Sequence, residues 1–220
     1  WVLHMVRAQL GPDLYRRCIK TYLERFQFKN VVTADLNSVI EELSGRSFDQ
    51  FFDQWVFRPH HPELDVAWSW DQKTRLAKIS VRQTQKITND VGLFRFPLKI
   101  RFKSGATTID REVLVQEKEE DFYIPLAVAP TIVRIDTALE VLANINFNPT
   151  PAMLQAQLAD SSDALGRVLA VEALGKRKDL ESVHQLTTAT NQEAVSGVSL
   201  SAAPTLQAVH SLIRIAAAPH

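Results

Sequence analysis

Residues 33–66 read TADLNSVIEELSGRSFDQFFDQWVFRPHHPELDV, and this stretch decides how the chain is organised. Its first part predicts a helix, because apolar residues recur at the spacing of one buried helix face. These residues are Leu36, Val39, Ile40 and Leu43. Asp35 lies in the first turn, where a carboxylate suits the positive end of the helix dipole. Gly45 is expected to end the helix, since glycine adopts the left-handed conformation without steric cost.

A second helix should follow, with Ser47 placed to cap its amino-terminal end. Its apolar stripe is aromatic and consists of Phe48, Phe51, Phe52 and Trp55. Pro59 and Pro62 prevent the helix from continuing. Beyond them the apolar period changes from 3.6 to 2, at Leu64, Val66, Trp68 and Trp70. The stretch therefore marks a junction between a helical part and a strand-rich part, and Trp55 is expected to be buried at that junction.

Two more helices are predicted before this stretch. Residues 1–10 form an apolar-rich helix ended by Gly11, and Pro12 begins a helix that runs to about Phe26. The second is expected to bury Leu14, Cys18, Ile19, Tyr22 and Phe26. The apolar faces of these short helices are wider than the helices can cover among themselves. We therefore expect either self-association through Trp1, Leu3, Met5 and Val6 or fraying of the first helix.

From Leu64 to Asn146 the pattern is that of β-strands. Strands are expected at Leu64–Trp70, Arg75–Gln83, Phe94–Phe102, Thr107–Gln116, Asp121–Ile124 and Ile132–Asp136. Polar turn signals separate them, and the charge run Glu117–Asp121 is interpreted as a solvated hairpin tip. Short strands with polar turns and no intervening helix are typical of an antiparallel β-sandwich.

After a linker at residues 148–151 the pattern is helical from Met153 to Leu180. The run Asp163–Gly175, DALGRVLAVEALG, resembles one HEAT repeat through its aspartate-to-arginine spacing and its Ala-Leu-Gly end. A second helix pair is expected at Glu181–Thr188 and Pro204–Ala216. The serine- and alanine-rich run Val198–Pro204 departs from the repeat pattern.

The opening stretch resembles the end of the catalytic domain of aminopeptidase N-type zinc peptidases, the gluzincins, where that domain passes into their β-sandwich domain. The matching segments are Thr33–Leu43, Ser44-Gly45, Phe51-Phe52, Gln54-Trp55-Val56 and Pro62-Glu63-Leu64. The segments Val2-Leu3-His4-Met5, Arg7 and Leu10-Gly11 are similar to the helix that follows the family's Tyr-x-Lys-Gly segment. The resemblance extends over residues 1–146, about two-thirds of the chain.

The resemblance implies a multidomain fold with α and β parts. Residues 1–60 would be the terminal helices of the catalytic domain, residues 61–147 a β-sandwich, and residues 148–220 part of a HEAT-like helical domain. The implied function is that of a non-catalytic carboxy-terminal portion of a zinc-dependent aminopeptidase, which releases amino-terminal residues from peptides. The implied partners are the rest of the catalytic domain and, in the longer protein, a peptide substrate.

In this family the zinc motif and the catalytic tyrosine precede the region of resemblance. The resemblance therefore implies zinc in the longer protein, with no catalytic, metal-binding or cofactor-binding residue in this chain. The sequence agrees, because a zinc peptidase motif has two histidines at i and i+4 with a glutamate between them. None of the six histidines has such a partner: His4, His60, His61, His184, His210 and His220. Adjacent residues of an extended segment point to opposite sides, so His60 and His61 are not expected to chelate one ion.

Composition narrows the classes of function that remain possible for this chain. The 25 basic and 25 acidic residues cancel, so no global field attracts nucleic acid or an anionic membrane. No run of about eighteen apolar residues predicts a membrane span. The single cysteine, Cys18, excludes an intrachain disulfide and is interpreted as a buried, inert thiol rather than a nucleophile. Asp49 and Asp53 share one helix face and are interpreted as solvated charges rather than a catalytic pair.

Two non-enzymatic alternatives remain. A TBP-associated factor of the transcription machinery resembles the same family and serves as a scaffold, so this chain could belong to a protein-interaction module without activity. Trp68 and Trp70 share one face of a predicted strand and could form a platform for carbohydrate, although core packing is the favoured interpretation. The presence or absence of His-Glu-x-x-His before the family resemblance begins would separate the enzyme from the scaffold.

Overall fold

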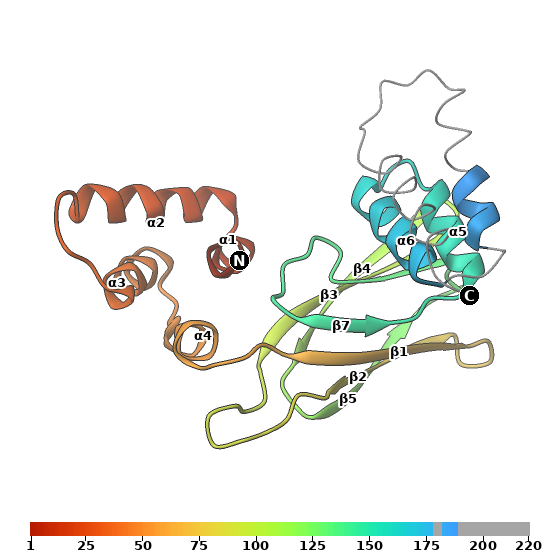
Figure 1. Ribbon diagram of the computed structural model, residues 1–220, viewed down its shortest axis with the longest axis horizontal. Coiled ribbons are helices and arrows are strands. Elements are labelled where there is room, and N and C mark those ends of the chain that lie inside the picture. Colours follow the sequence, from red (N-terminus) through yellow and green to blue (C-terminus); the bar gives the residue numbers. More distant parts are fainter. Residues whose placement is uncertain (178–181, 189–220) are drawn as a thin grey trace, which may run out of the picture.

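The computed structural model describes residues 1–177 and 182–188. Four helices come first: α1 (Val2–Leu10), α2 (Pro12–Arg25), α3 (Thr33–Ser44) and α4 (Asp49–Phe52). The chain continues from α4 into a π-helix, η1 (Asp53–Phe57), before the first strand. Figure 1 shows α1–α4 at one end of the molecule and the later helices at the other, with the strands between them. None of the described helices is long and apolar enough to cross a membrane.

The predicted signals of the first helices are largely confirmed. Gly45 adopts the left-handed conformation, with φ of 67°, and ends α3. The Asp35 carboxylate accepts a hydrogen bond from the Val32 amide at 2.8 Å, which closes the first turn of α3. Val39 and Ile40 are fully buried, whereas Leu43 is 37% exposed against expectation. The helix turns Leu43 away from the interior because the predicted apolar stripe is wider than the contact surface.

Two details of the helical part differ from the prediction. The residue that directly precedes α4 is Phe48 and not Ser47, but the Ser47 hydroxyl accepts from the Asp49 amide at 3.3 Å, and the Phe48 amide donates to the Glu41 carboxylate at 2.8 Å. Along α2 only Cys18 is fully buried, while the other residues predicted to be buried are partly exposed. These are Leu14, Ile19, Tyr22 and Phe26. The helix contacts its neighbours along a narrow strip, and the rest of its apolar face stays accessible.

In the part of the chain that the structure describes, seven strands form two sheets. The four-stranded sheet has the order β5-β2-β1-β7 and the three-stranded sheet the order β4-β3-β6. Their bounds are β1 (Glu63–Asp71), β2 (Leu76–Gln83), β3 (Phe96–Ser104), β4 (Thr107–Val115), β5 (Glu119–Pro125), β6 (Ile132–Ile135) and β7 (Asn144–Phe147). All six strands predicted from the sequence are present. β7 was not predicted, because four residues are too few for a recognisable alternation.

β7 also changes the nature of the first sheet. It pairs with β1 in parallel, with Glu63 opposite Asn144 and Val66 opposite Phe147, whereas β1, β2 and β5 pair antiparallel. The sheet is therefore mixed, and the expectation of a wholly antiparallel arrangement was wrong. A parallel neighbour needs a long connection. Here that connection is the whole chain between β1 and β7, which builds every other strand.

The charge run Glu117–Asp121 is not a hairpin tip. Glu117 and Lys118 lie in the connection from β4 to β5, where the chain crosses from one sheet to the other, and Glu119–Asp121 are already part of β5. Asp121 pairs with Lys78 at 2.8 Å and Glu119 with Arg82 at 3.0 Å, both across the β2–β5 pair. The charges lie on the solvated face of a strand, and the interpretation as a turn was wrong.

The helical part and both sheets share one hydrophobic core. It includes Met5, Ile40, Phe52 and Trp55 from the helices, and Ile79, Leu98, Ile100 and Phe102 from the strands. Every second residue from Phe94 to Phe102 is buried, as predicted. Met5 and Val6 are 3% and 0% exposed, so they cannot take part in the self-association expected of α1; Trp1 and Leu3 remain exposed.

Two further helices, α5 (Pro151–Ala159) and α6 (Ala164–Arg177), follow the strands, and residues 182–188 are also helical. The helical span predicted from Met153 onward is therefore broken at residues 160–163. A second, smaller core joins these helices: Leu154, Leu158, Ala170, Val171, Leu174 and Leu186. The predicted helix at Pro204–Ala216, the run Val198–Pro204 and residue Glu181 lie outside the described residues.

Candidate interdomain site

The junction between the helices and the sheets is built around Trp55. Its side chain is 7% exposed, and its ring lies 5.3 Å from that of Phe94 and 6.2 Å from that of Phe96, between centroids. Phe51 contacts the same indole from the helical side, at 6.5 Å. The prediction that Trp55 is buried between the helical part and the strands is confirmed. The aromatic stripe thus extends from α4 through η1 onto β3.

Buried glutamines reinforce this junction by acting as substitutes for strand partners. The Gln54 side chain, in η1, accepts from the Arg95 amide at 2.8 Å and donates to the Arg95 carbonyl at 3.1 Å. The Gln83 side chain makes the same pair of bonds to Phe94, at 2.9 and 2.8 Å. Backbone polar groups need such partners when they are buried. The segment before β3 is therefore held by two side-chain amides.

Gln85 completes the network. Its side-chain amide donates to the side-chain oxygen of Gln83 at 3.0 Å, and its own side-chain oxygen accepts from the Glu63 backbone amide at 3.3 Å. None of the three glutamines was predicted from the sequence to have a role. A signal was present, since Gln83 and Gln85 continue the inward-facing positions of Ile79 and Val81, and polar residues at inward positions indicate a buried network.

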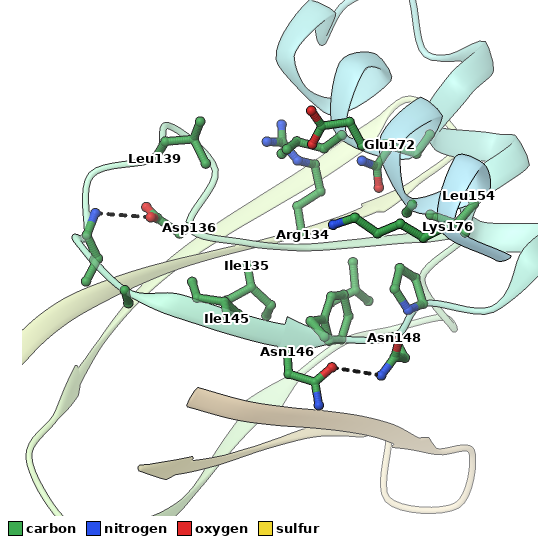
Figure 2. Close-up of a pocket in the computed structure, with 18 of the residues that line it drawn as sticks. Arg134, Ile135, Asp136, Leu139, Ile145, Asn146, Asn148, Leu154, Glu172 and Lys176 are labelled. Carbon is green, nitrogen blue, oxygen red and sulfur yellow. Dashed lines mark hydrogen bonds between the residues drawn. The ribbon is translucent and has the colours of Figure 1, made fainter. Parts of the chain in front are cut away.

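A cavity of about 570 Å³ lies at the other end of the sheets (Figure 2). β6, β7, the loop between them and the helices α5 and α6 line it, and Trp1 reaches its edge. Ile135, Ile145 and Leu154 provide apolar walls, while Asn146 and Asn148, hydrogen-bonded to each other at 3.1 Å, form a polar side. Its size is that of a small-molecule pocket. Among the described residues that line the cavity, no nucleophile lies next to a base, the arrangement used in covalent catalysis.

Asp136 anchors the loop that leads from β6 into this cavity. The residue is 2% exposed and has a positive φ of 51°. Its carboxylate accepts from the amides of Glu140 and Val141, at 2.8 and 3.0 Å. Burial raises the pKa of the Asp136 carboxyl above its ordinary value, and the two amide bonds offset only part of that effect. The group thus holds the loop in shape with a charge that the environment disfavours.

The residues weighed from the sequence do not converge on this cavity. Cys18 is fully buried in α2, and burial raises the pKa of its thiol. Asp49 accepts from the Asn37 side chain at 2.8 Å, and Asp53 pairs with Arg58 at 2.7 Å, both at the surface. Trp68 and Trp70 are half-buried against the main core, and the Trp70 ring nitrogen donates to the Leu126 carbonyl at 3.4 Å. The two tryptophans pack on the core rather than forming an open platform.

The described residues do not fit a zinc ion. Within residues 1–177 and 182–188, no three histidine, cysteine, aspartate or glutamate side chains come together as metal ligands. His4 is exposed and contacts the Trp1 ring at 6.1 Å, while His60 and His61 follow η1 and His184 lies beyond α6. A zinc site needs four ligands at about 2 Å. His210 and His220 are not among the residues that the structure describes.

Comparison with known proteins shows what the chain is similar to. Residues 1–55 match the Peptidase family M1 domain. The puromycin-sensitive aminopeptidase of Caenorhabditis elegans is 22% identical over 188 residues, which cover 83% of this chain and 19% of that protein. Aminopeptidase M1-A of Oryza sativa subsp. japonica is 25% identical over 199 residues, covering 83% and 22%. The predicted resemblance to the aminopeptidase N-type family is thereby confirmed.

Two further matches cover different shares of this chain. Aminopeptidase N of Lactococcus lactis is 34% identical over 65 residues, or 30% of this chain and 8% of that protein. The crystal structure of Legionella pneumophila aminopeptidase A in complex with aspartic acid matches 94% of this chain and 25% of that chain, with a TM-score of 0.74 at 12% identity. That likeness shows the fold, which combines helices with mixed and antiparallel sheets. The chain spans about a fifth of the length of the first two relatives.

Proposed function

We propose that this chain is the non-catalytic carboxy-terminal portion of a zinc-dependent aminopeptidase that releases amino-terminal residues from peptides. The observation that carries the proposal is continuity: the residues that match the M1 domain end at Trp55, and the same tryptophan belongs to the core of the sheets. Residues 1–60 would be the last helices of the catalytic domain, which the rest of that domain would cover.

The remaining assignments extend the same proposal. Residues 61–147 would be the β-sandwich domain, supported by two sheets around one core. Residues 148–220 would begin a HEAT-like domain, supported by the α5–α6 pair and its separate core. Zinc, held by residues elsewhere in the longer protein, would activate the water that attacks the peptide. In this proposal the chain positions the last helices of the catalytic domain, because Trp55 and Gln54 fix them on the sheets.

The test compares the 220-residue chain with the longer polypeptide encoded around it. Aminoacyl-coumarin substrates report hydrolysis, and each protein is assayed with added zinc and with a chelator. We expect turnover from the longer polypeptide alone, abolished by the chelator, and a His-Glu-x-x-His motif in its sequence. Chelator-sensitive hydrolysis by the 220-residue chain would overturn the non-catalytic role. An inactive longer polypeptide without that motif would overturn the enzymatic parent and leave the scaffold.

A further inference from the structure

Charged side chains gather where the turn between α5 and α6 touches the three-stranded sheet. On β3, the Lys103 ammonium donates to the Asp160 carboxylate at 2.6 Å and to the Ser162 hydroxyl at 3.0 Å. The Lys103 and Asp160 side chains are only 16% and 12% exposed. An ion pair this far from solvent is weakly screened by salt. It joins residues 57 positions apart in the sequence.

A second pair lies beside it. Arg134 on β6 is 3% exposed and forms an ion pair with Asp163, which is 12% exposed. The same guanidinium donates to the Thr137 carbonyl at 3.0 Å, and Arg101 lies 3.7 Å from the Asp163 carboxylate. Figure 2 shows Arg134 rising from the sheet toward the helices. A buried guanidinium without a carboxylate would carry a large desolvation cost.

Asp163 also begins α6. Its other carboxylate oxygen accepts from the Gly166 amide at 2.8 Å, an amino-terminal cap for the helix. Gly166 leaves room for the arginine, since a Cβ there would lie 2.8 Å from the Asp163 carboxylate and 3.1 Å from the Arg134 guanidinium. Gln157 of α5 donates to the Gly166 carbonyl at 2.6 Å. The cap, the ion pair and the contact between helices therefore meet at one point.

We propose that Lys103, Arg134, Asp160 and Asp163, here called the charge clamp, fix α5 and α6 to β3 and β6, so that the sheets and this helix pair move as one rigid body. The linker at residues 148–150 is then not a hinge, although its composition suggests one. Separating the helices from the sheet would remove the carboxylate partners of Lys103 and Arg134 at the same time. The cap of α6 would also lose its fixed position. The proposal stands apart from the aminopeptidase assignment, because it concerns only contacts within this chain.

Hydrogen exchange of the 220-residue chain tests the clamp. In the wild type, the amides of α6 should open no faster than those of β1. Asp163→Asn keeps an oxygen for the Gly166 amide but removes the charge opposite Arg134, and Lys103→Met keeps the apolar stem without the ammonium. Each should speed exchange in α5 and α6 about tenfold while β1 is unchanged, the effect of one lost charged hydrogen bond. Asp121→Asn, which removes an ion-paired carboxylate on β5, is the matched control.

Two results would overturn the clamp. One is exchange in α5 and α6 that is within about twofold of the Asp121→Asn control for both clamp variants, well below the effect of a lost charged hydrogen bond. The other is a wild type in which α6 already opens independently of β1. If a variant fails to fold, hydrogen exchange of the wild type at high ionic strength provides the test. We expect the amides of α5 and α6 to stay protected at high salt. A selective loss of their protection would overturn the clamp, because it would show an exposed contact that salt screens.

Discussion

The ring of Trp55 lies 5.3 Å from the ring of Phe94, and this contact joins the last of the M1-matched helices to the sheets. Trp55 is in η1, and Phe94 lies in the segment directly before β3. The pair therefore ties the stability of the helical part to that of the strands. Breaking it should affect both parts together.

Trp55→Ala should lower the free energy of unfolding by about 3–5 kcal/mol, because it leaves a large cavity in the shared core. Phe57→Ala, in the same π-helix but 66% exposed, is the control and should cost far less. Denaturant melts followed by far-UV circular dichroism measure both. A loss below about 1 kcal/mol for Trp55→Ala would show that the residue is peripheral to the core.

Gln54→Leu should cost about 1–3 kcal/mol, because the Arg95 amide and carbonyl lose their buried partner. The substitution keeps the volume of the side chain, so the loss reports hydrogen bonding rather than packing. Gln50→Leu serves as the control, since Gln50 is exposed and its side-chain oxygen accepts from the Arg95 guanidinium at 3.2 Å. Equal melting curves for the two variants would contradict the role given to Gln54.

Gly166→Ala should destabilise α5 and α6, although alanine favours a helix by about 1 kcal/mol over glycine. The added methyl group would lie 2.8 Å from the Asp163 carboxylate, closer than Cβ atoms normally approach, and 3.1 Å from the Arg134 guanidinium, so both side chains would have to shift. Gly92→Ala is the control, because nothing lies within 4 Å of a Cβ at that position. Thermal melts compare the two, and a more stable Gly166→Ala protein would show that the arginine can move aside at little cost.

Asp136 should make stability depend on pH in a defined direction. Its pKa is raised in the folded protein, so the folded state binds the proton more tightly than the unfolded state does. Stability then falls as pH rises from the ordinary aspartate pKa, about 3.9, through the raised folded-state value. Asp136→Asn removes this dependence.

Denaturant melts of wild type and Asp136→Asn across that range measure the difference. We expect the free energy of unfolding of the wild type, relative to the variant, to decrease as pH rises and then to level off. His4 and Glu140 interact electrostatically with Asp136 but are present in both proteins, so the comparison removes their effect. A difference that stays constant with pH, or that increases, would show that burial does not raise the pKa of this group.

The isolated chain should associate through the tip between α2 and α3 rather than through α1. Phe28 is 98% exposed, Val32 67% and Leu23 61%, and apolar side chains gathered in this way favour contact between copies. Phe28→Ser combined with Val32→Ser should lower the association seen by light scattering. Trp1→Ser with Leu3→Ser is the control at α1. A larger effect of the control pair would restore the original expectation that α1 is the contact.

The strong periodic signals predicted the fold well. The alternation from Phe94 to Phe102 gave β3, and the aromatic stripe before Pro59 placed Trp55 at the junction. Signals that need three-dimensional context were not predicted. β7 has four residues and is a strand only because β1 lies beside it. Its parallel direction depends on how the intervening chain folds.

The candidate site was predictable only in part. The absence of a zinc motif and the role of Trp55 follow from spacing along the chain. The charge clamp does not, because Arg134 and Asp163 are 29 residues apart and neither position differs in local pattern from an ordinary surface charge. The burial of Asp136 could not be predicted from the sequence either, since an aspartate at the end of a strand is normally a solvated turn residue. Long-range pairing created these sites.

The parallel pairing of β1 and β7 sets where the two helical parts attach to the sheets. The chain enters the sheets beside η1 along β1 and leaves toward α5 along β7, running the same way, so the two helical parts lie at opposite ends (Figure 1). A nine-residue strand such as β1 is roughly 30 Å long at about 3.3 Å per residue. β7 pairs with the first half of β1 and ends opposite Val66, so the chain leaves toward α5 roughly 10 Å from the first residue of β1, at about 3.3 Å per residue. A rotation of about 10° where β1 begins would therefore displace the far end of β1 by about 5 Å, but the end of β7 by only about 2 Å.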